Sequence, residues 1–369
     1  MSGDDHAWMA RALQLARKGL YSTHPNPRVG CVIVKHGALV GEGWHVRAGE
    51  PHAEVHALRQ AGARAAGATA YVTLEPCSHY GRTPPCAEAL VKAGVGRVVA
   101  AMQDPNPQVA GRGLALLRSV GIEVASGVLE SEARAVNAGF IKRMETGLPY
   151  LRAKLAMSLD GRTAMASGES QWITGPAARA EVQRLRAQSS VVLTGADTVL
   201  MDDARLTVRA AELGLDEETT ALALQRPPLR VLVDGRLRVP LEAPFFQAGP
   251  ALVATSADEQ AAYYRAAGHE LLALPGAARQ VDLHALLREL ATRGANEVLL
   301  EAGPRLAGAF AALGLIDEYQ IFVAAKFLGS TARPLLDLPL ERMRDARELR
   351  IADIRAVGYD WKITAVPHT

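Results

Sequence analysis

One histidine, one glutamate and two cysteines are spaced in this chain like the ligands and the acid–base group of a catalytic metal site. His52 and Glu54 are one residue apart, and Cys77 and Cys86 follow downstream. A structural zinc site fills all four tetrahedral positions with protein side chains, whereas one histidine and two cysteines leave the fourth position to water. We therefore predict that His52, Cys77 and Cys86 bind Zn²⁺ and that Glu54 is the catalytic proton shuttle.

The order His-x-Glu, Pro-Cys, Cys is typical of zinc deaminases that act on amino-bearing nucleobase rings. That pattern usually has two residues between the cysteines, and here residues 78–85 place eight between them. Gly81, Pro84 and Pro85 favour turns, so the segment can loop out and let both sulfurs meet one ion. The alternative is that the two cysteines are small buried apolar residues, but their position after a His-x-Glu favours metal binding.

The third cysteine belongs to a different pattern. Cys31 lies in the apolar run 29–34, which predicts a buried strand. We therefore expect Cys31 to pack in a core and not to act as a fourth ligand.

The length and charge of the chain limit the number of domains and the kinds of partner that we expect. A chain of 369 residues exceeds what one hydrophobic core usually serves, which favours two domains. The net charge is only +2, and lysines and arginines are scattered among acids, which disfavours a nucleic-acid partner. No stretch approaches the roughly 20 apolar residues of a membrane span, and no signal peptide is recognisable. Three cysteines fit a reducing compartment, so we expect a cytoplasmic protein.

The first part of the chain alternates strand and helix patterns. An amphipathic helix ends near Gly19, a hairpin follows, and a helix begins directly after His52. Further strands are expected at 71–74, 97–102 and 123–125, and helices at 86–93 and 113–120. This alternation predicts a sheet covered by helices.

Four polar residues near the expected metal site are candidates for binding the substrate. Asn26, between two prolines, offers both an amide donor and a carbonyl acceptor to a ring. His45, His79 and Arg82 lie in loops, the last two between the cysteines. The alternatives are an ordinary turn asparagine and solvated surface side chains.

A domain boundary is expected at residues 146–149, which gives domains 1–146 and 147–369. Strands expected at 190–194, 230–234, 251–254 and 297–301 alternate with helical stretches, which predicts a largely parallel α/β sheet. Ligands bind such sheets at the carboxyl ends of the strands. Residues 301–308 open a helix at one such end, where free backbone amides could bind a pyrophosphate. The glycine spacing is not that of a Rossmann fingerprint, and a plain strand-to-helix turn is the alternative.

Motifs along nearly the whole chain resemble the bifunctional riboflavin-biosynthesis deaminase/reductase family. The matching segments are the Pro-Asn-Pro-Arg-Val-Gly stretch 25–30, His-Ala-Glu at 52–54, the Pro-Cys to Cys loop 76–86, and the stretches 154–162 and 168–174. In this family the long loop between the cysteines is a regular feature. The resemblance implies an α/β fold with a cytidine-deaminase-like N-terminal domain and a dihydrofolate-reductase-like C-terminal domain.

The resemblance also implies the cofactors, Zn²⁺ and NADPH, and two successive reactions. Hydrolytic deamination of a diaminopyrimidinone ribosyl phosphate would be followed by reduction of its ribosyl group to ribityl. Transferred by motif, the residues that would contact NADPH are Ala156, Trp172, Thr198, Asp202, Gly303, Pro304, Arg305, Leu306, Ala307, Gly308 and Ala309. Those that would contact the substrate are Ser170, Arg186, Leu206, Arg209 and Glu301. Arg186 and Arg209 are the expected phosphate partners, because a guanidinium can bind phosphate oxygens bidentately. Lys154 and Asp160 are further polar candidates, and a homo-oligomer is expected.

Three other functions remain open at this point. A nucleic-acid editing deaminase would share the metal site but would need a basic groove. A sensor would use zinc only to hold the fold, with a closed coordination sphere. A deaminase with a silent reductase domain, or one specific for another pyrimidine, can be distinguished only by turnover.

Overall fold

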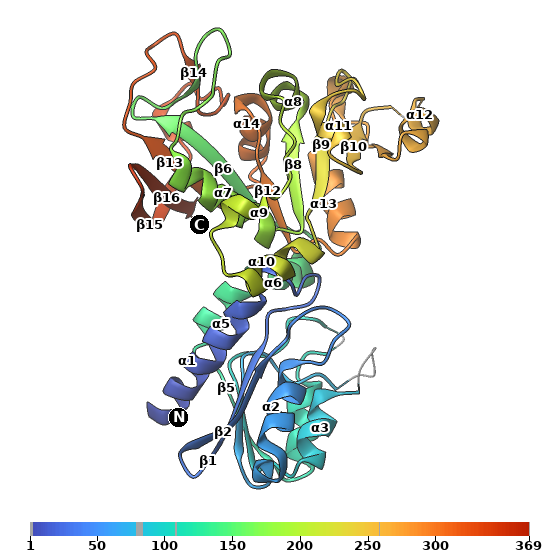
Figure 1. Ribbon diagram of the computed structural model, residues 1–369, viewed down its shortest axis with the longest axis vertical. Helices are drawn as coiled ribbons and strands as arrows, with labels where there is room; N and C mark the ends of the chain where they lie inside the picture. The colour runs from blue at the N-terminus through green and yellow to red at the C-terminus, as the bar shows by residue number, and fades with distance from the viewer. Residues whose placement is uncertain (1–2, 79–83, 108, 258, 369) are drawn as a thin grey trace. The chain divides into compact units, whose positions relative to one another are not determined.

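The computed structural model describes residues 3–368 apart from residues 79–83, 108 and 258 (Figure 1). The chain divides into two compact units, Met1–Leu148 and Pro149–Thr369. Each unit has a sheet of its own.

The first unit contains a five-stranded sheet in the order β2-β1-β3-β4-β5. Its strands are β1 (Gly30–Lys35), β2 (Ala38–Trp44), β3 (Thr69–Val72), β4 (Arg97–Ala100) and β5 (Glu123–Ser126). The pairs β1–β2 and β1–β3 are antiparallel, and β3–β4 and β4–β5 are parallel. The α-helices described in this unit are α1 (Gly3–Arg17), α2 (Ala53–Ala61), α3 (Cys86–Lys92), α4 (Arg112–Ser119), α5 (Glu130–Val136) and α6 (Ala138–Thr146).

Helices cover both faces of this sheet, as the alternating pattern predicts. A Cβ atom on Gly30 would lie 2.0 Å from the Ala12 carbonyl oxygen of α1. A Cβ atom on Gly43, which pairs with Cys31, would lie 2.7 Å from the Ala53 carbonyl oxygen of α2. Because successive residues of a strand point to opposite faces, α1 and α2 lie on opposite sides of β1.

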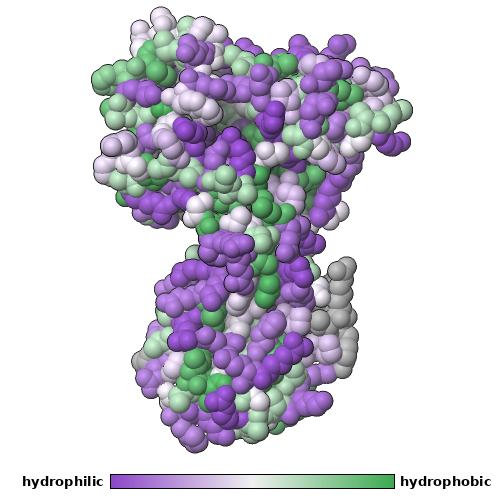
Figure 2. All heavy atoms as spheres, in the orientation of Figure 1, coloured by the Kyte–Doolittle hydropathy of each residue, from purple (hydrophilic) through white to green (hydrophobic). Residues whose placement is uncertain are grey.

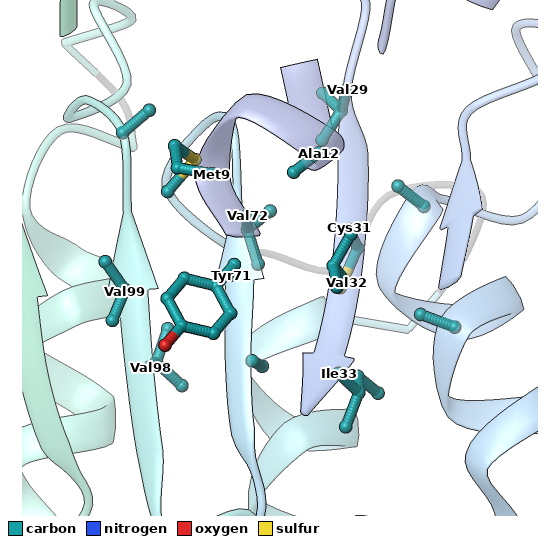
Figure 3. Close-up of a cluster of buried hydrophobic side chains, with 14 of the residues drawn as sticks. Met9, Ala12, Val29, Cys31, Val32, Ile33, Tyr71, Val72, Val98 and Val99 are labelled. Carbon is teal, nitrogen blue, oxygen red and sulfur yellow. The ribbon is translucent and has the colours of Figure 1, made fainter. Parts of the chain in front are cut away.

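The core of the first unit lies between these layers. Figure 3 shows Met9 and Ala12 of α1 against side chains of β1, β3 and β4. Cys31 is fully buried in this cluster. The prediction that Cys31 packs in a core is therefore confirmed.

The second unit contains a nine-stranded sheet in the order β11-β10-β9-β8-β12-β6-β13-β16-β15. Its strands are β6 (Tyr150–Ser158), β8 (Val191–Gly195), β9 (Leu229–Val233), β10 (Leu252–Thr255), β11 (Glu270–Ala273), β12 (Glu297–Leu300), β13 (Glu318–Ala324), β15 (Leu349–Val357) and β16 (Asp360–Pro367). All neighbours from β11 to β13 pair in parallel, and β13–β16 and β16–β15 are antiparallel. A separate short ribbon pairs β7 (Arg162–Ala164) with β14 (Arg333–Pro334).

Helices connect the strands of this sheet, and several of them contact it. Those described are α7 (Pro176–Gln188), α8 (Ala196–Asp202), α9 (Ala210–Leu213), α10 (Glu217–Gln225), α11 (Pro244–Gln247), α12 (Ala261–Ala266), α13 (Leu283–Thr292) and α14 (Pro304–Ala312). The apolar side of α7 packs against Phe322 of β13 and Leu299 of β12. The parallel part of the sheet was predicted, whereas the antiparallel edge formed by β16 and β15 was not.

Polar side chains dominate the visible surface of each unit, with apolar residues in scattered groups (Figure 2). Among the helices that the structure describes, none has both the length and the apolar character required to cross a membrane.

Candidate active sites

His52, Cys77 and Cys86 converge in the first unit to form a three-ligand cluster. Their ligand atoms all lie within 4.8 Å of one another. His52 Nδ1 is 3.3 Å from Cys86 Sγ and 3.6 Å from Cys77 Sγ. This is the only such group of three among the described residues. One imidazole nitrogen and two thiolate sulfurs suit Zn²⁺, and a three-ligand set leaves one tetrahedral position open.

Secondary structure explains why these three residues meet. His52 is the N-cap of α2 and Cys86 is the first residue of α3. The two helices are in contact and lie side by side in Figure 1. Cys77 lies in the segment between β3 and α3, where its sulfur accepts a hydrogen bond from the Cys86 N–H at 3.3 Å. Its carbonyl oxygen accepts another from the Ala87 N–H at 3.1 Å.

The electrostatics of the cluster favour a thiolate. A hydrogen bond from Cys86 lowers the pKa of Cys77 to about 4, and His52 contributes in the same direction. The same hydrogen bond, together with burial, raises the pKa of Cys86. Because cysteine binds a metal as the thiolate, a divalent ion bound here would displace a remaining thiol proton.

Glu54 lies in the first turn of α2 beside this cluster. Its side chain is buried, and Oε2 has no hydrogen-bond partner among the described residues. Burial raises the pKa of Glu54, although the charge of His52 opposes the shift. A buried carboxylate oxygen without a partner, next to two sulfurs and an imidazole, fits a site that holds a metal ion and a water molecule.

Asn26 and His45 form a second layer next to His52. Asn26 Nδ2 lies 3.1 Å from His45 Nε2, and His45 Nδ1 lies 3.2 Å from the Pro51 carbonyl oxygen. Burial lowers the pKa of His45 to about 4, so the ring is neutral and Nδ1–H can donate to Pro51. The rings of His45 and His52 meet edge to face at 5.2 Å. The other two candidates, His79 and Arg82, lie outside the described residues.

A buried carboxylate that the sequence analysis missed lies two residues before Cys77. Glu75 accepts hydrogen bonds from the backbone N–H groups of Asp104, Gly111, Gly113 and Leu114 at distances of 2.8–3.2 Å. Its side chain is only 3% exposed. The available signal was a glutamate in an otherwise apolar strand end directly before Pro-Cys.

The second unit has a large cavity at the carboxyl edge of its parallel strands. Its volume is about 1250 Å³. Thirteen of the sixteen residues predicted for NADPH and substrate line it: Ala156, Ser170, Trp172, Arg186, Thr198, Asp202, Leu206, Arg209, Glu301, Gly303, Pro304, Arg305 and Leu306. Ala307, Gly308 and Ala309 follow inside α14 and are not among the lining residues, because the helix leads away from the cavity.

One side of this cavity contains a buried ionic group. Arg186 donates from Nε and Nη2 to the two carboxylate oxygens of Glu301, at 2.6 and 2.9 Å, and from Nη1 to the Thr207 carbonyl oxygen. Burial would raise the pKa of Glu301, but the charge of Arg186 lowers it. Lys154 also lines the cavity, and burial lowers its pKa. Three N–H groups of Arg186 are thus engaged by protein partners, and its contact with a phosphate stays a prediction.

Two further polar contacts join residues that line this cavity. The Ser170 hydroxyl donates to Asp202 at 2.6 Å, and the Gly303 N–H donates to the Thr198 hydroxyl at 3.1 Å. The second contact connects the start of α14 with α8, and the first connects Ser170 with the last residue of α8. Gly303 is the N-cap of α14, so the predicted strand-to-helix turn is present and its first backbone N–H groups face this region.

Trp172 lines the cavity, whereas Asp160 does not. Trp172 is 61% exposed and stacks under the Arg179 guanidinium at 4.6 Å, so its ring is accessible at the cavity wall. Asp160 accepts hydrogen bonds from the Leu328 and Gly329 N–H groups, which assigns it to holding a loop.

Comparison with known proteins gives a consistent result for both units. Residues 2–102 match the cytidine and deoxycytidylate deaminase zinc-binding region, and residues 149–363 match the RibD C-terminal domain. The riboflavin biosynthesis protein RibD of Escherichia coli strain K12 is 55% identical over 96% of this chain and 97% of its own length. RibD of Haemophilus influenzae is 48% identical over 99% of this chain and 98% of its own length.

Solved structures agree with these sequence relationships. Acinetobacter baumannii RibD, form 1, superposes with a TM-score of 0.91 at 48% identity and 99% coverage of both chains. A Thermotoga maritima diaminohydroxyphosphoribosylaminopyrimidine deaminase/5-amino-6-(5-phosphoribosylamino)uracil reductase superposes with a TM-score of 0.86 at 34% identity, also with 99% coverage of both. These relatives confirm a deaminase-like unit followed by a dihydrofolate-reductase-like unit, and the chain belongs to the RibD family of bifunctional riboflavin-biosynthesis enzymes, which use zinc and NADPH.

Proposed function

We propose that this chain deaminates a diaminopyrimidinone ribosyl phosphate in its first unit and reduces the ribosyl group of the product to ribityl in its second. The observation that carries the proposal is the presence, in one chain, of an open His-Cys-Cys cluster beside a buried glutamate and of a cavity at the carboxyl edge of a parallel sheet. Family membership supports the order of the two reactions.

In the first unit, His52, Cys77 and Cys86 would hold zinc, which when bound lowers the pKa of a coordinated water. Glu54 takes a proton from that water and passes protons to the ring nitrogen and to the departing amino group. Water is consumed and ammonia leaves. Burial favours this role, because a carboxylate with a raised pKa returns a proton more readily near neutral pH.

Asn26 is proposed to orient the pyrimidine ring, and His45 to support Asn26. His45 is neutral, and its Nε2 can accept a hydrogen bond from the Asn26 amide, which fixes the direction of that amide. The Asn26 carbonyl oxygen is then directed away from His45 and can accept a hydrogen bond from an amino group. His79 and Arg82 remain candidates for the ribosyl phosphate.

In the second unit, NADPH, when bound, supplies a hydride to C1 of the ribosyl group. We propose that the N-terminus of α14, with Gly303, Pro304 and Arg305, binds its pyrophosphate, because free backbone N–H groups at a helix N-terminus attract anions. The Gly303 N–H already donates to the Thr198 hydroxyl and Pro304 has no N–H, so the donors proposed for the pyrophosphate are the N–H groups of Arg305 and Leu306. Ala156, Trp172 and Asp202 are proposed to contact the cofactor, and Ser170, whose hydroxyl donates to Asp202, to contact the substrate.

Arg209 is a better candidate for the substrate phosphate than Arg186. Three of the five N–H donors of the Arg186 guanidinium are already engaged by Glu301 and Thr207. Arg209 is exposed, and its Nε forms an ion pair with Glu212 at 3.0 Å. An exposed pair of this kind is weak, so a phosphate can replace the carboxylate at little cost.

We also propose that the chain is a cytoplasmic homo-oligomer. The edge strand β15 is exposed along nearly its whole length, and Ile351 and Ile354 are 55% and 52% exposed. Trp361 on the neighbouring strand β16 is 51% exposed. An exposed apolar strand at a sheet edge favours association with a second copy. Light scattering of the wild type and of Ile354→Asp tests this, and a monomeric wild type would refute it.

The function itself is tested by following ammonia release and NADPH absorbance together. The zinc-loaded protein is incubated with the diaminopyrimidinone ribosylamino phosphate, with Glu54→Gln as control. Ammonia followed by an equivalent loss of NADPH, both absent in the variant, supports both assignments. Ammonia without NADPH consumption would refute the role proposed for the second unit.

A further inference from the structure

The segment that delivers Cys77 is anchored by a carboxylate that takes no part in the chemistry described above. Glu75 Oε2 accepts from the N–H groups of Asp104 and Gly111, and Oε1 accepts from those of Gly113 and Leu114. Each oxygen therefore has two donors, and the carboxylate bridges the loop after β4 and the first turn of α4. An anion with four backbone donors is a strong and directional contact.

Close packing of α4 against the Glu75-Pro76 backbone accompanies these hydrogen bonds. A Cβ atom on Gly113 would lie 1.9 Å from the Pro76 carbonyl oxygen, so only a glycine allows α4 to approach the Glu75-Pro76 backbone this closely. The Glu75 N–H also donates to the Met102 carbonyl oxygen at 3.0 Å. Main chain and side chain of Glu75 are thus both held.

Cys77 is held from its other side by α3. Its sulfur and its carbonyl oxygen accept hydrogen bonds from the N–H groups of Cys86 and Ala87. The ligand therefore lies between two helix N-termini, one reached through Glu75 and one contacted directly. Loss of the Glu75 anchor would leave only the α3 contact to define the position of the sulfur.

We propose that Glu75 is a positioning residue of the zinc site, which fixes the Glu75-Pro76-Cys77 segment against α4 so that Cys77 and Cys86 present their sulfurs to one ion. This inference rests on the proposed role of His52, Cys77 and Cys86 as zinc ligands. Residues that orient metal ligands from outside the coordination sphere typically change metal affinity about 10–100-fold when replaced.

The test compares zinc affinity in three forms of the full chain. In Glu75→Gln, the side-chain amide retains one oxygen and turns its NH₂ group toward two N–H donors, so one pair of hydrogen bonds is lost. Asp5→Asn is a matched control, because Asp5 is an equally buried carboxylate of the same unit, bound by Arg97 and Tyr71. Affinity is measured by competition with a chromogenic chelator, and the coordination geometry by the absorption spectrum of the Co²⁺-substituted protein.

We expect Glu75→Gln to bind zinc about 10–100-fold more weakly and to show an altered Co²⁺–thiolate spectrum. Asp5→Asn should keep the affinity and spectrum of the wild type even if its melting temperature falls. Equal affinity in Glu75→Gln and the wild type would overturn the proposal, as would an equal loss in both variants. If Glu75→Gln does not fold, Glu75→Asp, which keeps the charge on a shorter side chain, is expected to show the weaker affinity, and wild-type affinity in Glu75→Asp would overturn the proposal.

The wild type also tests the underlying assignment separately. If wild-type protein binds no zinc, or if Cys86→Ala binds it as well as the wild type, the ligand assignment fails regardless of Glu75. Wild-type binding that Cys86→Ala abolishes, with no effect of Glu75→Gln, overturns only the positioning role.

Discussion

Arg186 and Glu301 form a two-point ion pair in the wall of the second cavity, with N–O distances of 2.6 and 2.9 Å and side chains that are 13% and 8% exposed. The two residues come from α7 and from the end of β12, 115 positions apart. The pair therefore connects α7 to the end of β12, directly before the turn into α14.

Glu301→Gln should destabilise the second unit. Removal of one partner from a buried pair leaves the other charge without compensation, which typically costs about 3–5 kcal/mol. Calorimetry, with the transition of the second unit identified by its shift on adding NADPH, measures the effect. Glu212→Gln, which removes the exposed partner of Arg209, should change stability by at most about 1 kcal/mol. Similar losses in both variants would contradict the interpretation.

Glu54→Gln should retain zinc and lose deamination by a factor of about 10²–10⁴, the usual contribution of a general acid–base group. The amide is of similar size but cannot take or return a proton. Metal content by atomic absorption and ammonia release by a coupled assay check the two parts. NADPH binding should be unchanged, since it involves the second unit. Ammonia release at the wild-type rate would remove Glu54 from its proposed role.

Removal of zinc by a chelator should abolish ammonia release and lower the melting temperature of the first unit. Metal-binding free energy adds to folding free energy when the ligands are brought together only in the folded chain. The dissociation constant for NADPH, measured by fluorescence, should be the same before and after chelation. Restored activity on adding Zn²⁺ completes the test, and unchanged ammonia release without metal would contradict the zinc assignment.

Lowering the pH should destabilise the second unit, in part because Glu181 becomes protonated. Burial would raise the pKa of this carboxyl, but hydrogen bonds from Lys362 and Arg184 lower it to about 2. A carboxyl whose pKa is depressed on folding adds stability above its unfolded pKa and loses that contribution as the pH falls toward the folded value. The expected window is therefore about pH 4.5 to 2, with a contribution of up to about 3 kcal/mol. Denaturation curves of Glu181→Gln should show a weaker pH dependence there, and curves with the same slope as the wild type would exclude this role.

Much of the first unit could be predicted, because its signals are local. Helix and strand periodicity, together with the His-x-Glu and Pro-Cys spacing, gave β1 to β5 and the metal cluster. Glu75 could not be predicted in the same way, since its four partners are backbone N–H groups 29 to 39 residues further along the chain. Nearly every residue has a backbone N–H group, so residue types do not indicate which of these groups will bind a given carboxylate.

The second unit was predicted less completely for two reasons. The strands β13, β15 and β16 follow the last helix, and the register shift between Ile351 and Asp353 interrupts the apolar–polar alternation of β15. The engagement of Arg186 by Glu301 depends on the packing of α7 over β12, which connects distant parts of the chain. By contrast, the turn from β12 into α14 was predicted directly from an apolar strand followed by Gly303 and Pro304.

The positions of the three ligands in the chain give a bound ion a further role as a cross-link. His52 and Cys77 are 25 residues apart, and Cys77 and Cys86 are separated by nine. An ion shared among them closes two loops at once and ties the start of α2, the end of the β3 segment and the start of α3 to one point. Such an ion would join three segments of the folded chain as a disulfide joins two, and a reductant that breaks a disulfide would not break this link.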